Sequence, residues 1–196
     1  MKGLEEEDEK EVAESQDEDE DENEEDSKNQ RPGEGVQGEA AIPGRSLLLG
    51  LGNDILTDDG IGLRVASEVR QRLAADNNIT VLASSEMGLA LLDLVVGFDN
   101  LVIVDAVQTG KAAVGFVHEI EATELQCSAP WSPHFVGIGE MLALGAALGL
   151  SVPKRVRIFA VEVGDPFTIG TALTPELDRV VPRIVDQVLR FLQFLG

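Results

Sequence analysis

A glycine-rich loop with two adjacent carboxylates is the first segment of this chain that could do chemistry. It opens with Gly50 and Gly52, after an apolar run, and reaches Asp58 and Asp59 just before a helical pattern begins. The two glycines are spaced as in a dinucleotide-binding fingerprint, but Ile55 stands where the third glycine is required. A phosphate would also meet like charges here, which disfavours a nucleotide site. Two interpretations stay open: one of the acids caps the following helix, or the loop supplies a functional carboxylate.

A further carboxylate, Asp105, follows the apolar run Leu101–Val104. A carboxylate at the edge of a buried strand has a desolvation cost unless it gains a partner. Its place at the carboxyl end of a predicted strand therefore favours a functional role. The alternative is a turn-forming aspartate that hydrogen-bonds to its own backbone.

Two histidines and one cysteine complete the set of reactive side chains. His134 lies in the proline-braced segment 130–135, just before a predicted helix, and is either a ligand or a helix-capping or core histidine. His118 lies inside a strand pattern, and we interpret it as structural or exposed. Cys127 has no recognisable partner, so we interpret it as a bystander. A single cysteine also excludes an internal disulfide framework and a four-cysteine zinc site.

One acid of the glycine-rich loop, Asp105 and His134 together are candidate ligands of a divalent metal ion. Two carboxylates and one imidazole form an oxygen and nitrogen donor set that suits a borderline divalent ion. Three protein ligands leave positions open for water or for a ligand from a partner. The same trio could instead act as base and orienting group in a hydrolysis, although no motif sets a serine or cysteine nucleophile beside it.

Alternating strands and helices must position these residues. Apolar runs predict strands over 46–52, 79–83, 101–105, 115–120 and 155–162. Helical spacing predicts helices over 60–75, 89–96, 137–150 and 174–195. The last helix is predicted to have Thr174 as its N-cap and Pro175 at its first position. The alternation predicts an α/β fold with a mostly parallel sheet and helices on both faces, in which ligands bind beyond the carboxyl ends of the strands.

The negative charge of the chain is concentrated in its first 44 residues. The 196 residues have a net charge of −21, and residues 1–44 contain 18 acidic against four basic side chains. Because such a segment repels itself and has little to bury, we predict an acidic disordered tail and linker over 1–44 and one domain over 45–196. The tail is either a solubilising extension or an arm for a basic partner or for cations.

The same composition excludes several classes of partner. An acidic chain disfavours binding to nucleic acid or to an anionic membrane surface through bulk electrostatics. No apolar run has the length of a membrane span, and the acidic N-terminus is unlike a signal peptide. We therefore expect a cytoplasmic protein with no membrane partner.

The candidate segments occur, in the same order, in a known family. Residues 46–195 resemble the [NiFe]-hydrogenase maturation proteases in Gly50-x-Gly52-Asn53, Asp58-Asp59-Gly60-x-Gly62, Val104-Asp105-Ala106, Ser132-Pro133-His134 and Gly170-x-x-Leu173-Thr174-Pro175-Glu176. The resemblance implies a three-layer α/β/α sandwich around a twisted, mostly parallel five-stranded sheet. It also implies that Asp59, Asp105 and His134 are both the metal-binding and the catalytic residues.

The function implied by this resemblance is that of a processing endopeptidase. It would remove the C-terminal extension of a [NiFe]-hydrogenase large-subunit precursor after nickel insertion. The nickel would come with the precursor, and another divalent metal could bind to the isolated protein. We expect a monomer that meets its substrate transiently, and cleavage by water that the metal or a carboxylate activates.

Two features depart from the family pattern, and two other functions stay open. Segment 84–88, Ser-Ser-Glu-Met-Gly, stands where family members usually have a Gly-Gly-Thr turn, which changes the expected shape of the substrate cleft. The acidic tail has no counterpart in the family. The alternatives are a non-catalytic chaperone that binds metal or precursor, and a different hydrolase on the same sandwich.

Overall fold

The computed structural model describes residues 44–73, 78–121 and 137–195, so the predicted acidic tail lies outside the described residues, apart from Gly44. The described residues form a five-stranded sheet in the order β2-β1-β3-β5-β4. Four neighbouring strands are parallel, and β4 pairs antiparallel with β5. The predicted mostly parallel sheet is therefore confirmed. The strands are β1 (Ser46–Leu51), β2 (Ile79–Ser84), β3 (Asn100–Val107), β4 (Val117–Glu121) and β5 (Arg155–Glu162).

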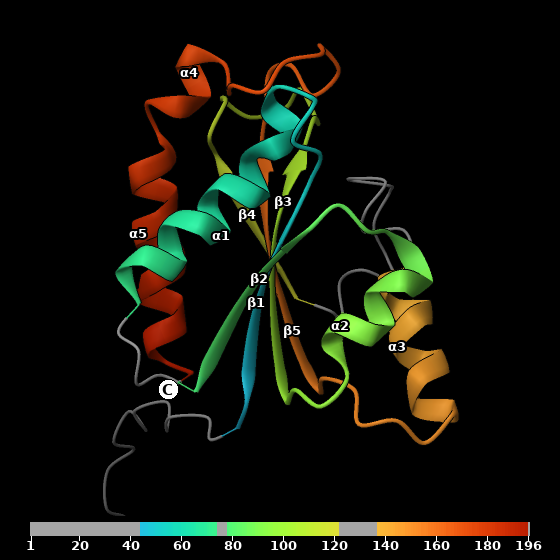
Figure 1. The fold of residues 1–196 in the computed structure, drawn as a ribbon. Coiled ribbons are helices and arrows are strands. Elements are labelled where there is room, and N and C mark those ends of the chain that lie inside the picture. The colour runs from blue at the N-terminus through green and yellow to red at the C-terminus, as the bar shows by residue number, and fades with distance from the viewer. Residues whose placement is uncertain (1–43, 74–77, 122–136, 196) are drawn as a thin grey trace, which may run out of the picture. The chain divides into compact units, whose positions relative to one another are not determined.

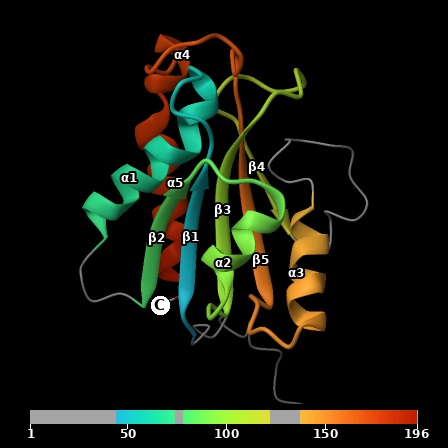
Figure 2. The ribbon, with the colours of Figure 1, turned by 45° about the vertical axis from the view of Figure 1, so that its right-hand side comes forward.

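Helices cover both faces of this sheet (Figures 1 and 2). On one face, α1 (Ile61–Arg72) and α5 (Val181–Gln193) bury an apolar cluster against the strands. On the other face, α2 (Leu92–Val95) and α3 (Ile138–Ala147) bury a second cluster. This arrangement is the predicted three-layer sandwich. Within the described ranges, no helix is long and apolar enough to cross a membrane.

The central strands explain the continuous apolar runs of the sequence. β1 and β3 are buried along their whole length, because helices cover both of their faces. Both side-chain positions of the two-residue strand period must then be apolar, which excludes an alternating pattern. The edge strands β2 and β4 include exposed positions and are correspondingly more polar.

The predicted C-terminal helix over 174–195 is divided into two helices. α4 (Pro175–Asp178) ends before Arg179, and α5 starts at Val181 with Pro182 in its first turn. Proline has no N–H for the carbonyl of Asp178, and its ring would clash with that carbonyl in a continuous helix. In the first turn of a new helix the missing N–H has no cost. Proline chemistry therefore explains why the single predicted helix is wrong here.

Two glycines bring α1 into contact with the backbone of the sheet. A Cβ atom placed on Gly62 would lie 2.1 Å from the carbonyl oxygen of Leu51 and 2.3 Å from that of Val104. A Cβ atom on Gly50 would lie 2.1 Å from the carbonyl oxygen of Gly62. The first turn of α1 consequently lies directly against the ends of β1 and β3. The short helix η1 (Asp58–Gly60), which precedes α1, contacts β3 in the same region.

Candidate functional site

Two of the three predicted site residues lie at the carboxyl edge of the sheet, which is the edge where the parallel strands end. Asp59 belongs to η1, after β1, and Asp105 lies near the end of β3. Because η1 packs against β3, the two carboxylates come from adjoining segments. His134 lies outside the described residues. Residues 44–73, 78–121 and 137–195 by themselves contain no group of three or more His, Cys, Asp or Glu side chains that could hold a metal.

Asp105 is part of the sheet and not of a turn. β3 continues two residues beyond it, so that Asp105 pairs with Ala160 and Val107 pairs with Glu162. The Asp105 side chain is buried, and its Oδ1 accepts a hydrogen bond of 2.8 Å from the N–H of Ala106. Alternate strand residues point to the same face, so Asp105 points with Val107 toward α2 and α3. The predicted turn at Asp105 is therefore wrong, whereas the hydrogen bond to the local backbone that the same interpretation included is present.

Asp58 has a different role from its neighbour Asp59. It is buried, and its carboxylate accepts hydrogen bonds from the N–H groups of Gly164 (3.3 Å), Asp165 (3.0 Å) and Thr174 (2.8 Å), and from the Thr174 hydroxyl (3.1 Å). Neither η1 nor α1 has a side-chain cap, so the capping interpretation is wrong. Thr174 is the N-cap residue of α4 and Pro175 its first residue, as predicted, although the Thr174 side chain makes no cap hydrogen bond. Asp58 instead joins two distant loops, which leaves the partly buried Asp59 as the loop's functional candidate.

Glu162 is a buried acid at the same edge that the sequence reasoning missed. Its carboxylate accepts hydrogen bonds from the Thr109 N–H (2.8 Å) and hydroxyl (2.6 Å) and from the Gly110 N–H (2.7 Å). The Nε2 atom of His118 lies 3.1 Å from Oε2 of Glu162. Glu162 is an acid at the end of the apolar run of β5, just as Asp105 is an acid that interrupts the apolar run of β3. This shared pattern could have identified Glu162 as a candidate from the sequence.

His118 and Glu162 lie on the same face of the sheet as Asp105. Residues opposite each other on neighbouring strands point to the same face, and Ala160 is opposite both Asp105 and His118. Glu162 follows Ala160 by two residues and so points the same way. The Phe116 and His118 rings meet edge to face with centroids 4.8 Å apart. His118 is therefore a structural, partly buried residue, as one of our interpretations expected.

The hydrogen bonds to Glu162 make stability depend on pH. Burial raises the pKa of Glu162, but donation from Thr109, His118 and Gly110 outweighs it and holds the pKa below its usual value. A lowered pKa in the folded state means that stability is complete above the usual value and is lost as the pH falls through the folded pKa. We expect Glu162→Gln to reduce the free energy of unfolding at neutral pH by about 1 to 3 kcal/mol.

As the pH falls from neutral to acid, the free energy of unfolding of Glu162→Gln is expected to decrease less than that of the wild type. Urea denaturation at a series of pH values from neutral to acid measures both effects. Glu86→Gln is the matched control, since Glu86 is exposed and its carboxylate accepts no hydrogen bond from the described residues. Equal acid dependence in the wild type and Glu162→Gln would contradict the role given to these hydrogen bonds.

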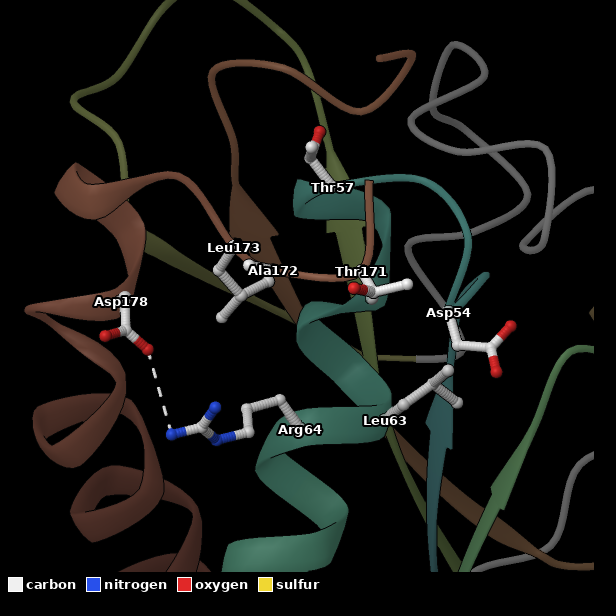
Figure 3. A pocket seen from close by; sticks show the side chains of 9 residues that line it. Asp54, Thr57, Leu63, Arg64, Thr171, Ala172, Leu173 and Asp178 are labelled. Carbon is white, nitrogen blue, oxygen red and sulfur yellow. Dashed lines mark ion pairs between the residues drawn. The ribbon is translucent and has the colours of Figure 1, made fainter. Parts of the chain in front are cut away.

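A pocket of about 370 Å³ lies beside the glycine-rich loop (Figure 3). Arg64 of α1 and Asp178 of α4 form an ion pair of 3.7 Å across it. The pocket is on the α1 side of the sheet, whereas Asp105, His118 and Glu162 point toward α2 and α3. It is therefore on the other side of the sheet from Asp105 and Glu162, although Gly60, which lines it, follows Asp59 directly. Its lining residues are Asp54, Thr57, Gly60, Leu63, Arg64, Thr171, Ala172, Leu173 and Asp178.

Comparison with known proteins connects this geometry with one family. A protein-family model described as hydrogenase maturation protease matches residues 63–191, more than half of the chain. The Hydrogenase 2 maturation protease of Escherichia coli K12 is 29% identical over 154 residues, which cover 78% of this chain and 93% of the relative. The hydrogenase expression/formation protein HupD of Thiocapsa roseopersicina is 28% identical over 152 residues, covering 76% and 68%.

Solved structures give the same result. The hydrogenase maturating endopeptidase HybD from E. coli has a TM-score of 0.68 at 28% identity and covers 78% of this chain and 94% of its own. The [NiFe] hydrogenase maturation protease HybD from Thermococcus kodakarensis has a TM-score of 0.59 at 22% identity, covering 76% and 99%. The second likeness, at its lower identity, concerns the fold alone.

Proposed function

The chain belongs to the hydrogenase maturation protease family, as its motifs predicted, and we propose that it removes the C-terminal extension of a [NiFe]-hydrogenase large-subunit precursor. Membership of the family makes it an endopeptidase of hydrogenase maturation. The observation that supports the finer proposal is the placement of Asp59 and Asp105 on adjoining segments at the carboxyl edge. We further propose a cytoplasmic monomer, since the net charge of −21 opposes association between copies.

We propose that Asp59, Asp105 and His134 bind the nickel ion that the precursor brings with it. Carboxylate oxygens and an imidazole nitrogen are donors that a borderline divalent ion accepts. Three protein ligands leave coordination positions for groups of the precursor itself. Binding then selects the loaded precursor, which makes cleavage wait for metal insertion. In the isolated protein, the same donors would accept another divalent ion.

The proposed chemistry is the addition of water to the scissile carbonyl carbon. A carboxylate at the edge takes the proton of the attacking water and returns it to the amine nitrogen as the C–N bond breaks. Asp105 is buried and held by the Ala106 N–H, so its position is fixed before substrate arrives. Asp59 is only partly buried, and it is the carboxylate of the pair that solvent reaches more readily.

The intact mass of the precursor tests this function. We expect nickel-loaded precursor to lose one C-terminal peptide on incubation with the protein, while nickel-free precursor keeps its full mass. Cleavage of both forms would contradict the proposal that the protein recognises the nickel. Cleavage of neither form would contradict the proposed protease activity. A pull-down of the same pair identifies the chaperone alternative, because a chaperone binds the precursor without shortening it.

A further inference from the structure

Two loops at the carboxyl edge form a small antiparallel ladder, which we call the lip (residues 55–57 and 168–170). Leu56 and Ile169 form its bridge. The N–H of Thr57 donates to the Thr168 carbonyl at 3.0 Å, and the N–H of Gly170 donates to the Ile55 carbonyl at 3.0 Å. The lip lies beyond the ends of β1 and β5, at the end of the sheet opposite the C-terminus (Figure 1).

Only one side of the lip is open to a further strand. Leu56 and Ile169 form a non-hydrogen-bonded pair, so the N–H and carbonyl of each point away from the ladder. The Leu56 groups are satisfied within their own loop, by the Asn53 carbonyl and the Gly60 N–H, both at 3.3 Å. The N–H and carbonyl of Ile169 have no hydrogen-bond partner among the described residues. Ile169 is therefore a free donor and acceptor on a strand edge.

Hydrogen bonds to Asp58 and Asp165 hold the two loops of the lip in place. Oδ1 of Asp165 accepts hydrogen bonds from the N–H groups of Phe167 (3.2 Å) and Thr168 (3.0 Å). The Thr57 hydroxyl donates to the Asp165 carbonyl, and Asp58 binds the Asp165 N–H at 3.0 Å. A strand that pairs with an edge already in place loses less conformational entropy on binding than one that must order it.

Apolar side chains flank the free edge. Phe167 is 74% exposed, Ile169 is 84% exposed and Ile55 is 57% exposed. Exposed apolar groups around a strand edge are what an extended peptide with apolar side chains needs, since its main chain pairs with the edge and its side chains contact the surface. Thr57 of the lip is two residues from Asp59, so a bound strand passes close to the candidate site.

We propose that the lip binds the extended segment of the precursor near the scissile bond, which adds as a strand at Ile169. This proposal rests on the proposed function, because it concerns the substrate of that site. The Ile169 N–H donates to a carbonyl of the precursor, and the Ile169 carbonyl accepts from one of its N–H groups. An edge with a single donor and acceptor is too short to hold two copies of this chain together, but it can align a substrate segment.

The Ile169→Pro variant tests the main-chain contact. Proline removes the N–H and keeps the carbonyl, and the Ile169 N–H has no partner among the described residues that the substitution would take away. We expect the KM for nickel-loaded precursor to rise about tenfold, because the hydrogen bond from the Ile169 N–H to the precursor is lost and the paired strand is aligned less well. The kcat and the Tm are expected to stay nearly unchanged. Ile169→Ala, which keeps the N–H, is expected to raise KM less.

Phe194→Ala is the matched control, because Phe194 is an exposed aromatic residue at the C-terminal end of α5 and outside the lip, and we expect it to leave KM unchanged. An unchanged KM in Ile169→Pro, with wild-type cleavage intact, overturns the lip proposal and leaves the proposed function standing. Wild-type protein that cleaves no precursor overturns both.

A photo-crosslinking residue in place of Phe167 identifies the occupant. With nickel-loaded precursor present, we expect the crosslinked peptide to come from the C-terminal region of the precursor. A crosslink to a second copy of this chain, or to a remote surface of the precursor, overturns the proposal.

Discussion

The Asp59→Asn variant is expected to lose cleavage of nickel-loaded precursor by about 10²- to 10⁴-fold while keeping its thermal transition. The amide is nearly the same size as the carboxylate, so the packing of η1 is preserved. It has no negative charge to attract a metal ion, and it does not accept a proton from water at neutral pH. The measurement is a time course of precursor mass, with the transition temperature as the check on folding.

Asp54→Asn is the control for the loss of one charge from the same loop. Asp54 is exposed and lies five residues before Asp59, and we expect this variant to cleave at the wild-type rate. If Asp59→Asn cleaves at the wild-type rate as well, Asp59 is not a site residue. If the wild type binds precursor without ever shortening it, and Asp59→Asn weakens that binding, the chaperone interpretation replaces the protease.

The Gly62→Ala variant is expected to lower the free energy of unfolding by about 3 kcal/mol or more. Helix propensity alone predicts the opposite sign, since alanine is favoured over glycine in a helix by about 1 kcal/mol. The added methyl group, however, would lie 2.1 Å from the Leu51 carbonyl oxygen and 2.3 Å from that of Val104. Both are backbone atoms of central strands, so the contact is relieved only if α1 moves away from the sheet.

Such a movement would displace η1 and Asp59 as well, so precursor cleavage should fall together with stability. Urea denaturation and the cleavage assay measure the two effects. Gly60→Ala is the matched control, because a Cβ atom there meets only the Asn53 carbonyl oxygen, at 3.5 Å, and its φ of −73° suits alanine. We expect that variant to stay within about 1 kcal/mol of the wild type. Equal stability of Gly62→Ala and the wild type would contradict the close contact.

The sequence by itself determined the layered fold and the position of one catalytic candidate along it. Continuous apolar runs such as Leu101–Val104 arise only where both faces of a strand are covered, and that requirement is local. Because Asp105 directly follows this run, the sequence also predicted that Asp105 lies where the strand reaches the carboxyl edge of the sheet. His134, predicted from its loop, lies outside the described residues and stays a prediction.

Only the tertiary structure gives the physical reason for the different surroundings of Asp58 and Asp59, a choice that the family resemblance had made in favour of Asp59. The two have the same chemistry and adjacent positions, so their residue types and local spacing do not separate them. Asp58 became a structural anchor because Asp165 and Thr174, which are 107 and 116 positions away, bring their N–H groups to it. The free edge at Ile169 likewise exists only because two distant loops pair. Hydrogen-bond partners that come from remote segments depend on how the chain folds back on itself, which local sequence does not specify.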